Sequence, residues 1–414
     1  MASMKVSSSF PALRERNFRL YFYAQLISLA GTYLQSTAQG WLVFQLTNSA
    51  FWVGVVAALV FFPTFLLVLF GGAIVDRLDR RSILYITQIG AMVLAFVLGV
   101  LTIIHRIDLL EVNILALLLG IVNALDTPAR TAFISDMIND RENLGSAISL
   151  NSGMATTAMA VGPALAGILI ALIGTGWTFI INGFTFIAVI IALYAMELRS
   201  RNVEQKENPH PVTMVKVGLR YVASNSGLIF LVIIFGVMGI FGRSYSAIFP
   251  VIAAQMYNGG SEVFGYLLAS FGAGAAVGTL FLAIFLKKFS TKTWVVGGNI
   301  LVGLALIAFT FTRSLPWGLS LIFISGLAFV LELSVIVNIV QHVVDSAVLG
   351  RVLSIFYFFY FGGYSLGSFL MGWIAGKFGS ALTVGGNGVA ALLVGIIVFF
   401  MRDRILELTA HVKS

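Results

Sequence analysis

The stretch that decides the fold is GGAIVDRLDRRS, residues 71–82, which joins two long apolar runs. Five of the six residues from Asp76 to Arg81 are charged, whereas the runs on either side hold almost no charge. About 20 apolar residues suffice for a helix to cross a bilayer, and a short basic turn between two such runs is typical of a loop at the membrane surface. We therefore expect a chain that crosses a membrane repeatedly.

Composition supports this interpretation over the whole chain. Of its 414 residues, 59% are hydrophobic and 10% are charged, and the mean hydropathy is +0.99, far above that of a soluble domain. The absence of cysteine excludes structural disulfides, thiolate catalysis and cysteine-based metal sites. The four histidines are scattered along the chain, so we expect no metal centre, no cofactor and no enzyme active site.

The apolar runs are twelve in number, and the longest polar interruption falls after the sixth. The runs cover residues 19–46, 51–75, 82–104, 112–134, 146–173, 177–196, 227–254, 262–286, 292–312, 316–342, 352–376 and 380–401. We predict an all-α membrane protein with twelve transmembrane helices in two pseudo-symmetric six-helix bundles. The predicted domains are an N-terminal bundle at 1–196, a linker at 197–226 and a C-terminal bundle at 227–414.

A fixed offset indicates that the two halves are duplicates. The pairs separated by 205 residues are Leu144 and Leu349, Gly145 and Gly350, Ser149 and Ser354, Gly162 and Gly367, and Gly167 and Gly372. Asp126 and Glu332, separated by 206 residues, are approximate counterparts. Paired six-helix repeats with a site between them are a transporter architecture. The alternative is that two helical bundles merely share packing faces of small residues.

The basic residues give the orientation of the chain in the membrane. Of the 25 Lys and Arg residues, 21 fall in segments on one side, three fall in segments on the other, and Arg243 alone lies inside an apolar run. By the positive-inside rule, both termini are expected in the cytoplasm. Because orientation accounts for the net charge of +8, we expect a bilayer and no nucleic acid as partner.

The opening loop then carries a resemblance. Its pattern, Gly72-x-x-x-Asp76-Arg77-x-x-Arg80-Arg81, resembles the signature loop of the major facilitator superfamily. The resemblance implies that Asp76 accepts hydrogen bonds at the start of the helix near Arg351, latching the two halves together. It also implies that Arg80 faces an acid at the cytoplasmic end of the fourth helix, Asp126 or Asp136. The alternative is a basic turn that only sets topology.

Two further stretches narrow the resemblance. Gly162-Pro163-x-x-Ala166-Gly167, in the fifth helix, resembles the Gly-Pro motif of the superfamily's exporters, and it implies drug-type export by antiport. Pro163 removes a backbone donor and bends the helix, while the two glycines allow a partner helix to approach. Residues 126–153 and 41–54 resemble the bacterial branch that contains the enterobactin exporter and multidrug efflux pumps.

Ionisable residues inside membrane helices are costly and are functional candidates by default. Only Arg243, Asp126 and Glu332 qualify. We hypothesise that Glu332 or Asp126, in helices expected to line a central cavity, is a proton-coupling carboxylate. The alternatives are a structural partner for Glu332 and a structural pairing of Asp126 with Arg80 or Arg130, the latter placed at the cytoplasmic rim as part of the latch. Arg243 is expected to contact substrate or a gate.

Polar and aromatic residues mark the rest of the expected cavity. They are Gln35, Gln39, Asn123, Tyr245, Asn338, Gln341, Tyr357, Tyr360 and Tyr364. The last three share one helix face, and hydroxylated rings suit a bulky, partly polar solute such as a catecholate or an amphipathic drug. An ordinary packing stripe is the alternative.

The sequence thus predicts a monomeric secondary transporter of the bacterial plasma (inner) membrane that exports an organic solute by alternating access, with exchange of protons. A proton-coupled importer and a lipid flippase on the same fold remain alternatives.

Overall fold

The computed structural model describes residues 10–197, 211–285, 291–345 and 348–401; within these ranges, the side chains of 71–74, 76, 77, 211, 283, 285 and 291–293 are not described. Every regular element in the described ranges is helical. The first half contains η1 (Pro11–Arg14), α2 (Arg16–Thr47), α3 (Ala50–Arg77), α4 (Arg80–Ile103), α5 (Leu109–Met137), η2 (Arg141–Asn143) and α6 (Leu144–Ala195). The second half contains α8 (Ser226–Val237), η3 (Met238–Arg243), η4 (Ser244–Ile248), α9 (Phe249–Tyr257), α10 (Ser261–Phe285), α11 (Thr291–Phe311), α12 (Leu315–Val343), α13 (Leu349–Phe378) and α14 (Ser380–Phe400). Between the halves lies α7 (Pro211–Ala223).

These helices make twelve crossings, which confirms the predicted fold class. Ten described segments are long and apolar enough to span a membrane, and one of them covers the whole of α6. Gly174, with φ +84°, breaks α6 into two crossings. The 32-residue α2 supplies the remaining crossing, and α8, η3, η4 and α9 together make a single one.

The two halves repeat each other in local detail. α5 and α12 each contain 29 residues, and both ends of the pair are separated by 206 positions. Asn48 and Asn258 end the first crossing of their halves with φ of 47° and 50°, a left-handed conformation that Asn tolerates. Gly174 and Gly379 turn the chain between the last two crossings with φ of 84° and 83°, where glycine avoids the Cβ penalty.

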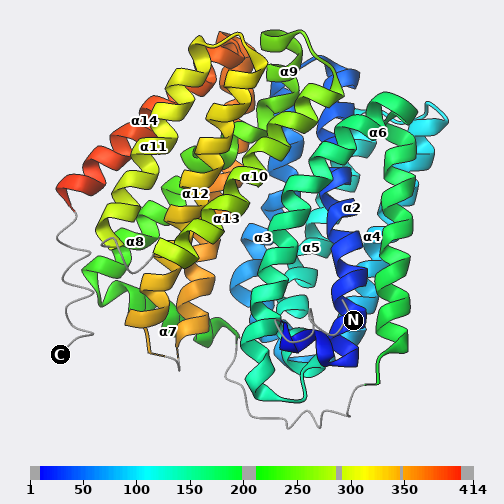
Figure 1. Ribbon diagram of the computed structural model, residues 1–414, viewed down its shortest axis with the longest axis vertical. Helices are drawn as coiled ribbons and strands as arrows, with labels where there is room; N and C mark the ends of the chain where they lie inside the picture. Colours follow the sequence, from blue (N-terminus) through cyan, green and yellow to red (C-terminus); the bar gives the residue numbers. More distant parts are fainter. Residues whose placement is uncertain (1–9, 198–210, 286–290, 346–347, 402–414) are drawn as a thin grey trace.

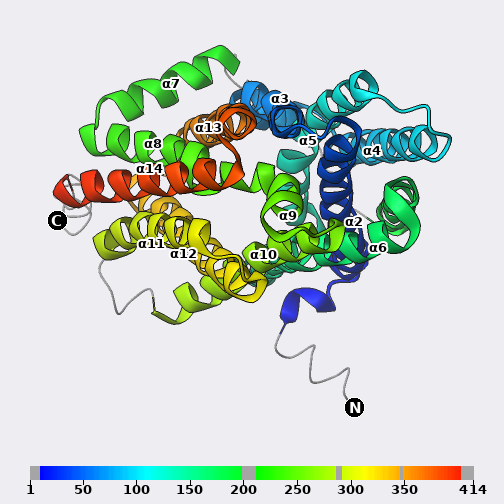
Figure 2. The same ribbon diagram turned by 90° about the horizontal axis from the view of Figure 1, so that it is seen from above.

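Each half packs mainly within itself. In the first half α6 contacts α2 and α4, and α3 contacts α5, while in the second half α11 contacts α12 and α14, and α10 contacts α12. Figures 1 and 2 show the two groups side by side, with α3 next to α13 and α6 next to α10 where they meet. The predicted linker, 197–226, contains α7, which packs on α13 where Gly218 approaches Arg351 and Ile355.

Candidate functional site

Two seams join the halves. We call the end of the bundle with the turns at Asn48 and Asn258 the far end, and the opposite end, where α2 begins and α14 ends, the near end (Figure 1). In the α3–α13 seam, a Cβ added to Gly54 would lie 2.7 Å from the Cα of Gly372. In the α6–α10 seam, a Cβ added to Gly265 would lie 2.9 Å from the Cα of Gly167. These two backbone approaches hold the halves together at the far end.

Aromatic rings complete the far-end closure. Trp41 of α2 stacks on Phe264 of α10 with ring centroids 6.2 Å apart. Phe51 of α3 meets Phe369 of α13 edge to face at 5.8 Å. Because these rings come from opposite halves, they seal the far end with apolar surface.

Glycines of α6 and α13 close to the near end make no such contacts. A Cβ added to Gly145 or Gly153 of α6, or to Gly350 of α13, would meet nothing within 4 Å. Ser152 and Thr157, on the same near-end part of α6, are exposed. The closest backbone contacts between the halves therefore lie toward the far end.

Arg243 lies in the middle of its crossing, at the end of the π-helical segment η3. Its guanidinium carbon is 5.7 Å from the ring centroids of both Phe271 and Tyr364, and it interacts electrostatically with Tyr360 and with Tyr33. Tyr33 belongs to α2 of the first half, 210 residues before Arg243, which is the offset that relates Asn48 to Asn258. These five residues, which we call the central site, therefore lie where the two halves meet.

Arg243 has no acidic partner in the part of the chain that the structure describes: no carboxylate there forms an ion pair with it. Its Nε–H is buried and donates to no acceptor among the described residues. A π-helical turn often marks a functional position, and a charge inside the membrane ordinarily faces a cavity or a partner. The central site is thus cationic, with aromatic walls.

The other predicted cavity residues divide into two groups. Tyr360 and Tyr364 lie at the central site, and the ring of Tyr357 packs 5.9 Å from that of Phe361 on the same helix. Asn123 and Asn338 are half-buried, and Gln341 is exposed. Tyr245, Gln35 and Gln39, in contrast, are buried, and the Nε2 of Gln39 makes no hydrogen bond with the described residues.

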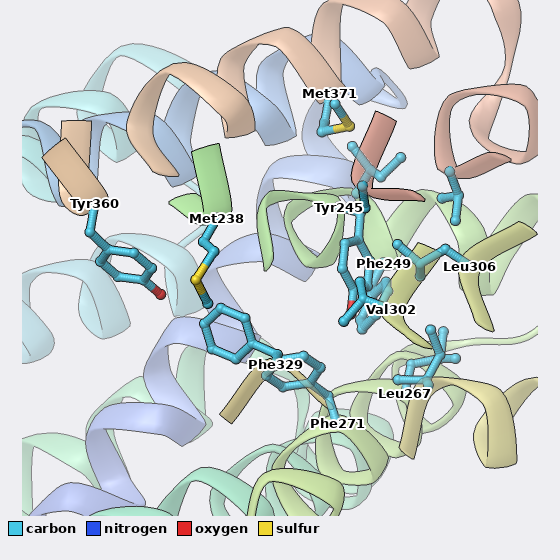
Figure 3. Packing of buried hydrophobic residues seen from close by; sticks show 14 of the residues in the cluster. Met238, Tyr245, Phe249, Leu267, Phe271, Val302, Leu306, Phe329, Tyr360 and Met371 are labelled. Atoms are coloured by element: carbon cyan, nitrogen blue, oxygen red, sulfur yellow. The ribbon is translucent and has the colours of Figure 1, made fainter. Parts of the chain in front are cut away.

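Tyr245 and Gln35 were expected at the cavity, and both make hydrogen bonds within their own halves. The Tyr245 hydroxyl hydrogen-bonds to Ser325 at 2.7 Å, and its ring packs against Phe249 and Phe271 in the core of the second half (Figure 3). Gln35 accepts a hydrogen bond from Asn182 of α6 at 2.5 Å. In each case a polar partner on a neighbouring helix of the same half satisfies the side chain.

Asp126 faces α4, not the central site. Its carboxylate accepts hydrogen bonds from Thr87 and Gln88, both at 2.8 Å, and lies 3.6 Å from the guanidinium of Arg130. Only 9% of its side chain is exposed. The structural pairing with Arg130 is therefore present, whereas the alternative partner Arg80 is engaged elsewhere.

Glu332 occupies the equivalent place in the second half. It is 2% exposed, accepts a hydrogen bond from Asn299 of α11, and lies against Gly298. We expected both acids to line the central cavity, but each turns toward a peripheral helix that supplies an amide donor. Beside Glu332 an apolar cavity of about 300 Å³ lies between α10, α11 and α12. Its walls are Phe281, Trp294, Gly297, Gly298, Leu301, Ala328 and Leu331.

The charged loop holds the near end of the first half together. Arg80 donates to Asp136 at 3.1 Å, and Arg81 donates to the carbonyl of Leu193 at 2.5 Å, so the loop binds the ends of α5 and α6. Asp79 caps α4 by accepting from the Ser82 amide at 2.9 Å. The side chains of Gly72, Asp76 and Arg77, which carry the predicted latch to the second half, lie outside those that the structure describes.

The Gly-Pro motif of α6 serves two different contacts. A Cβ on Gly162 would lie 2.6 Å from the Cβ of Tyr33, so this glycine lets α2 pack closely and sets the position of a central-site residue. Gly167 belongs to the α6–α10 seam, where Ser261 donates to its carbonyl at 3.3 Å. Pro163, between them, is buried.

Metal binding has no support in this arrangement. Within the ranges that the structure describes, no three His, Asp or Glu side chains come together as ligands.

Comparison with known proteins agrees with this architecture. A family model described as transmembrane secretion effector matches residues 7–413. The chain belongs to this family. The transmembrane secretion effectors are major facilitator transporters, not enzymes.

Several curated relatives cover nearly the whole effector chain at low identity. The staphyloferrin A transporter of Staphylococcus aureus is 24% identical over 94% of this chain and 96% of its own length. The multidrug efflux pump Tap of Mycolicibacterium fortuitum is 26% identical over 94% and 97%. The enterobactin exporter EntS of Escherichia coli is 21% identical over 93% and 91%.

Solved structures show the same fold. A bacterial homologue of the lysosomal transporter Spinster, in an inward-facing and unoccupied conformation, aligns with a TM-score of 0.76 at 15% identity over 95% of this chain and 98% of its own. A D-xylose–proton symporter aligns with a TM-score of 0.69 at 14% identity over 91% and 97%.

Proposed function

We propose that this transmembrane secretion effector exports an organic solute, siderophore-like or amphipathic, by alternating access in exchange for protons. The observation that carries the proposal is Arg243, which has no acidic partner among the described residues and lies among aromatic rings where the halves meet. A transporter needs a binding site that both halves share, so that closing either end changes the same contacts.

Orientation and location are part of the proposal. The 21-to-3 division of Lys and Arg supports a cytoplasmic near end. Together with the close contacts between the halves toward the far end, it supports an inward-facing conformation that loads solute from the cytoplasm. The bacterial relatives that carry names of exporters and efflux pumps support outward transport across a plasma membrane. We further propose that 1–196 and 227–414 move as units joined by 197–226, in a monomer.

Proton exchange is assigned to the two buried acids. Glu332 is the stronger candidate because its described partner is the neutral Asn299, so a proton can neutralise it without leaving another charge unpaired. Asp126 forms an ion pair with Arg130, and protonation of Asp126 would break that pair. Glu332 shares α12 with Phe329, whose ring lies 6.4 Å from that of Tyr360 at the central site.

Vesicles of opposite orientation test the direction of transport. Everted and right-side-out membrane vesicles containing the protein are given a pH gradient and a fluorescent amphipathic dye or an iron-free siderophore. We expect accumulation in everted vesicles, dependent on the gradient and absent in Arg243→Gln, with Arg106→Gln as a matched control at an exposed position.

The same experiment distinguishes the alternatives. Accumulation confined to right-side-out vesicles would indicate an importer. Movement of labelled phospholipid between leaflets, with no solute accumulation in either orientation, would indicate a flippase. Either outcome contradicts export of a soluble organic molecule.

A further inference from the structure

The helix between the two halves, α7, lies on the rim of the near end. Figure 1 places it at that end, and Figure 2, which looks along the bundle, shows it at the outer edge, outside α8 and α13. A Cβ added to Gly218 of α7 would lie 3.2 Å from the Cβ of Arg351 and 3.1 Å from its carbonyl oxygen. Because Arg351 is the third residue of α13, α7 packs at the level where a crossing begins.

One face of α7 is buried against the protein. Gly218 and Val222, four residues apart, are buried, and this spacing places them on the same side of the helix. The Tyr221 hydroxyl accepts a hydrogen bond at 3.5 Å from the amide of Asp345, just beyond the end of α12. These contacts fix which side of α7 faces away from the bundle.

The outward face of α7 carries two cations and three apolar side chains. Lys216 and Arg220, one helical turn apart, are exposed, and neither forms an ion pair with a carboxylate among the described residues. Val212, Val217 and Leu219 are between 38% and 48% exposed. In an interfacial helix, such apolar side chains enter the acyl region, while long basic side chains reach the headgroups.

The surroundings of α7 indicate that its outward face meets lipid. α7 contacts α8, on which Ile229 and Ile233, one helical turn apart, are exposed. Exposed isoleucines on a membrane-spanning helix face the acyl chains. The outward face of α7 therefore continues an apolar, lipid-facing surface at the depth where headgroups begin.

We propose that α7 is an interfacial helix that binds the headgroups of anionic phospholipids through Lys216 and Arg220. Two cations without carboxylate partners complement a negatively charged headgroup, whereas a zwitterionic headgroup has no net charge to offer them. Near an anionic membrane surface, each Lys or Arg strengthens binding by about fivefold. The two residues together should prefer an anionic lipid by up to about 25-fold.

Lipid bound to α7 would act on the joint between the halves. α7 contacts α13 of the second half and α3 of the first, and these two helices form one of the seams between the halves. An anchored α7 holds the near ends of both helices at a fixed depth in the membrane. Movement of the halves must then carry this anchor or release it.

Quenching by brominated lipids tests the proposal on the full-length protein. Because the chain has no cysteine, Thr213→Cys can carry a single fluorophore on the outward face, three and seven residues from Lys216 and Arg220. Nanodiscs of phosphatidylcholine receive brominated phosphatidylglycerol in one series and brominated phosphatidylcholine in the other. We expect phosphatidylglycerol to quench at the lower lipid fraction, and raised ionic strength to weaken its advantage, since salt screens exposed charges.

Charge variants identify the residues responsible. Lys216→Gln and Arg220→Gln should each lower the preference for phosphatidylglycerol by about fivefold. The double variant should lose the preference but still be quenched by both lipids. Exchanging the two residues, as Lys216→Arg with Arg220→Lys, keeps both charges and should keep the preference. Arg141→Gln removes an exposed cation of η2 in the first half and should change nothing.

Three results would rule out this role of α7. Absence of quenching by both lipids would show that the outward face lies in water. Equal quenching by the two lipids in the unsubstituted helix would show contact with the bilayer but no selection of anionic headgroups. A preference that survives in the double variant would show that other residues select the lipid.

Discussion

The α3–α13 seam makes the far-end closure sensitive to one methyl group. In Gly372→Ala the new Cβ would lie 2.7 Å from the carbonyl oxygen of Ala50 and 2.8 Å from the Cα of Gly54. Both contacts are backbone atoms, which cannot rotate away. Overpacking of this kind costs about 1–3 kcal/mol, which shifts the balance between closed and open far ends by about 5- to 140-fold.

Thiol labelling measures this shift directly, because the chain has no cysteine of its own. Ser261→Cys places a reporter in the α6–α10 seam, where the residue is 4% exposed. With a membrane-impermeant maleimide, labelling of the reporter in the Gly372→Ala background should accelerate by up to the same factor.

Gly376→Ala is the matched control, one turn along the same helix, where the added Cβ would meet Phe51 at an ordinary 3.9 Å. It should label at the rate of the reporter alone. Equal labelling of Gly372→Ala and the reporter alone, in protein that remains monodisperse, would show that the added methyl does not disturb the far-end closure. So would an acceleration in Gly376→Ala as large as that in Gly372→Ala.

Three further predictions concern acids in different settings. Burial tends to raise the pKa of Asp79, but hydrogen bonds from Ser82 outweigh it and leave the pKa below its ordinary value; this carboxylate therefore stabilises the fold at neutral pH, and its contribution is lost as the pH falls through that lowered pKa. Asp79→Ala should lower the unfolding free energy by about 1 kcal/mol at neutral pH, and Asp79→Asn should lower it much less. In thermal unfolding, the stability difference between the wild type and Asp79→Ala should shrink in acid. A difference that does not change with pH would contradict the capping role of Asp79. Glu332→Gln should keep the fold and the hydrogen bond to Asn299. It should still exchange solute across vesicles but lose accumulation driven by the proton gradient. If transport in this variant remains fully coupled to protons, Glu332 is not the coupling carboxylate. Asp126→Ala leaves the cation of Arg130 without its partner, so it should lower unfolding stability by about 3–5 kcal/mol; a thermal transition equal to the wild type would show that the pair is not structural.

The sequence predicts the architecture well because the membrane allows few solutions. Backbone groups in lipid must be satisfied within helices, so the apolar runs became crossings, and the repeat offset reappears in the lengths of α5 and α12. The break in α6 at Gly174 also falls between two predicted runs, 146–173 and 177–196. These features depend on local sequence and on hydropathy alone.

The site was predicted less completely, since a helix sequence shows which residues share a face but not which way that face points. Arg243 was identified by its charge, yet Tyr33, its counterpart 210 residues earlier, was overlooked because a tyrosine in a membrane helix is unremarkable by itself. Asp126 and Glu332 face neighbouring helices, where the amides of Gln88 and Asn299 donate hydrogen bonds to them. Each of these amides lies inside an apolar run, in the helix before the one that carries the acid. That pattern could have predicted their pairing with the acids.

Alternating access about the central site is tested most directly by distances between spin labels at the two ends of the bundle. One pair of introduced cysteines spans the halves at the far end, at Ser49 and Gly379, and the other spans them at the near end, at Gly145 and Gly350. We predict that solute and a change of pH move the two distances in opposite senses, the far-end pair lengthening as the near-end pair shortens. Two distances that stay fixed, or that lengthen and shorten together, would contradict it.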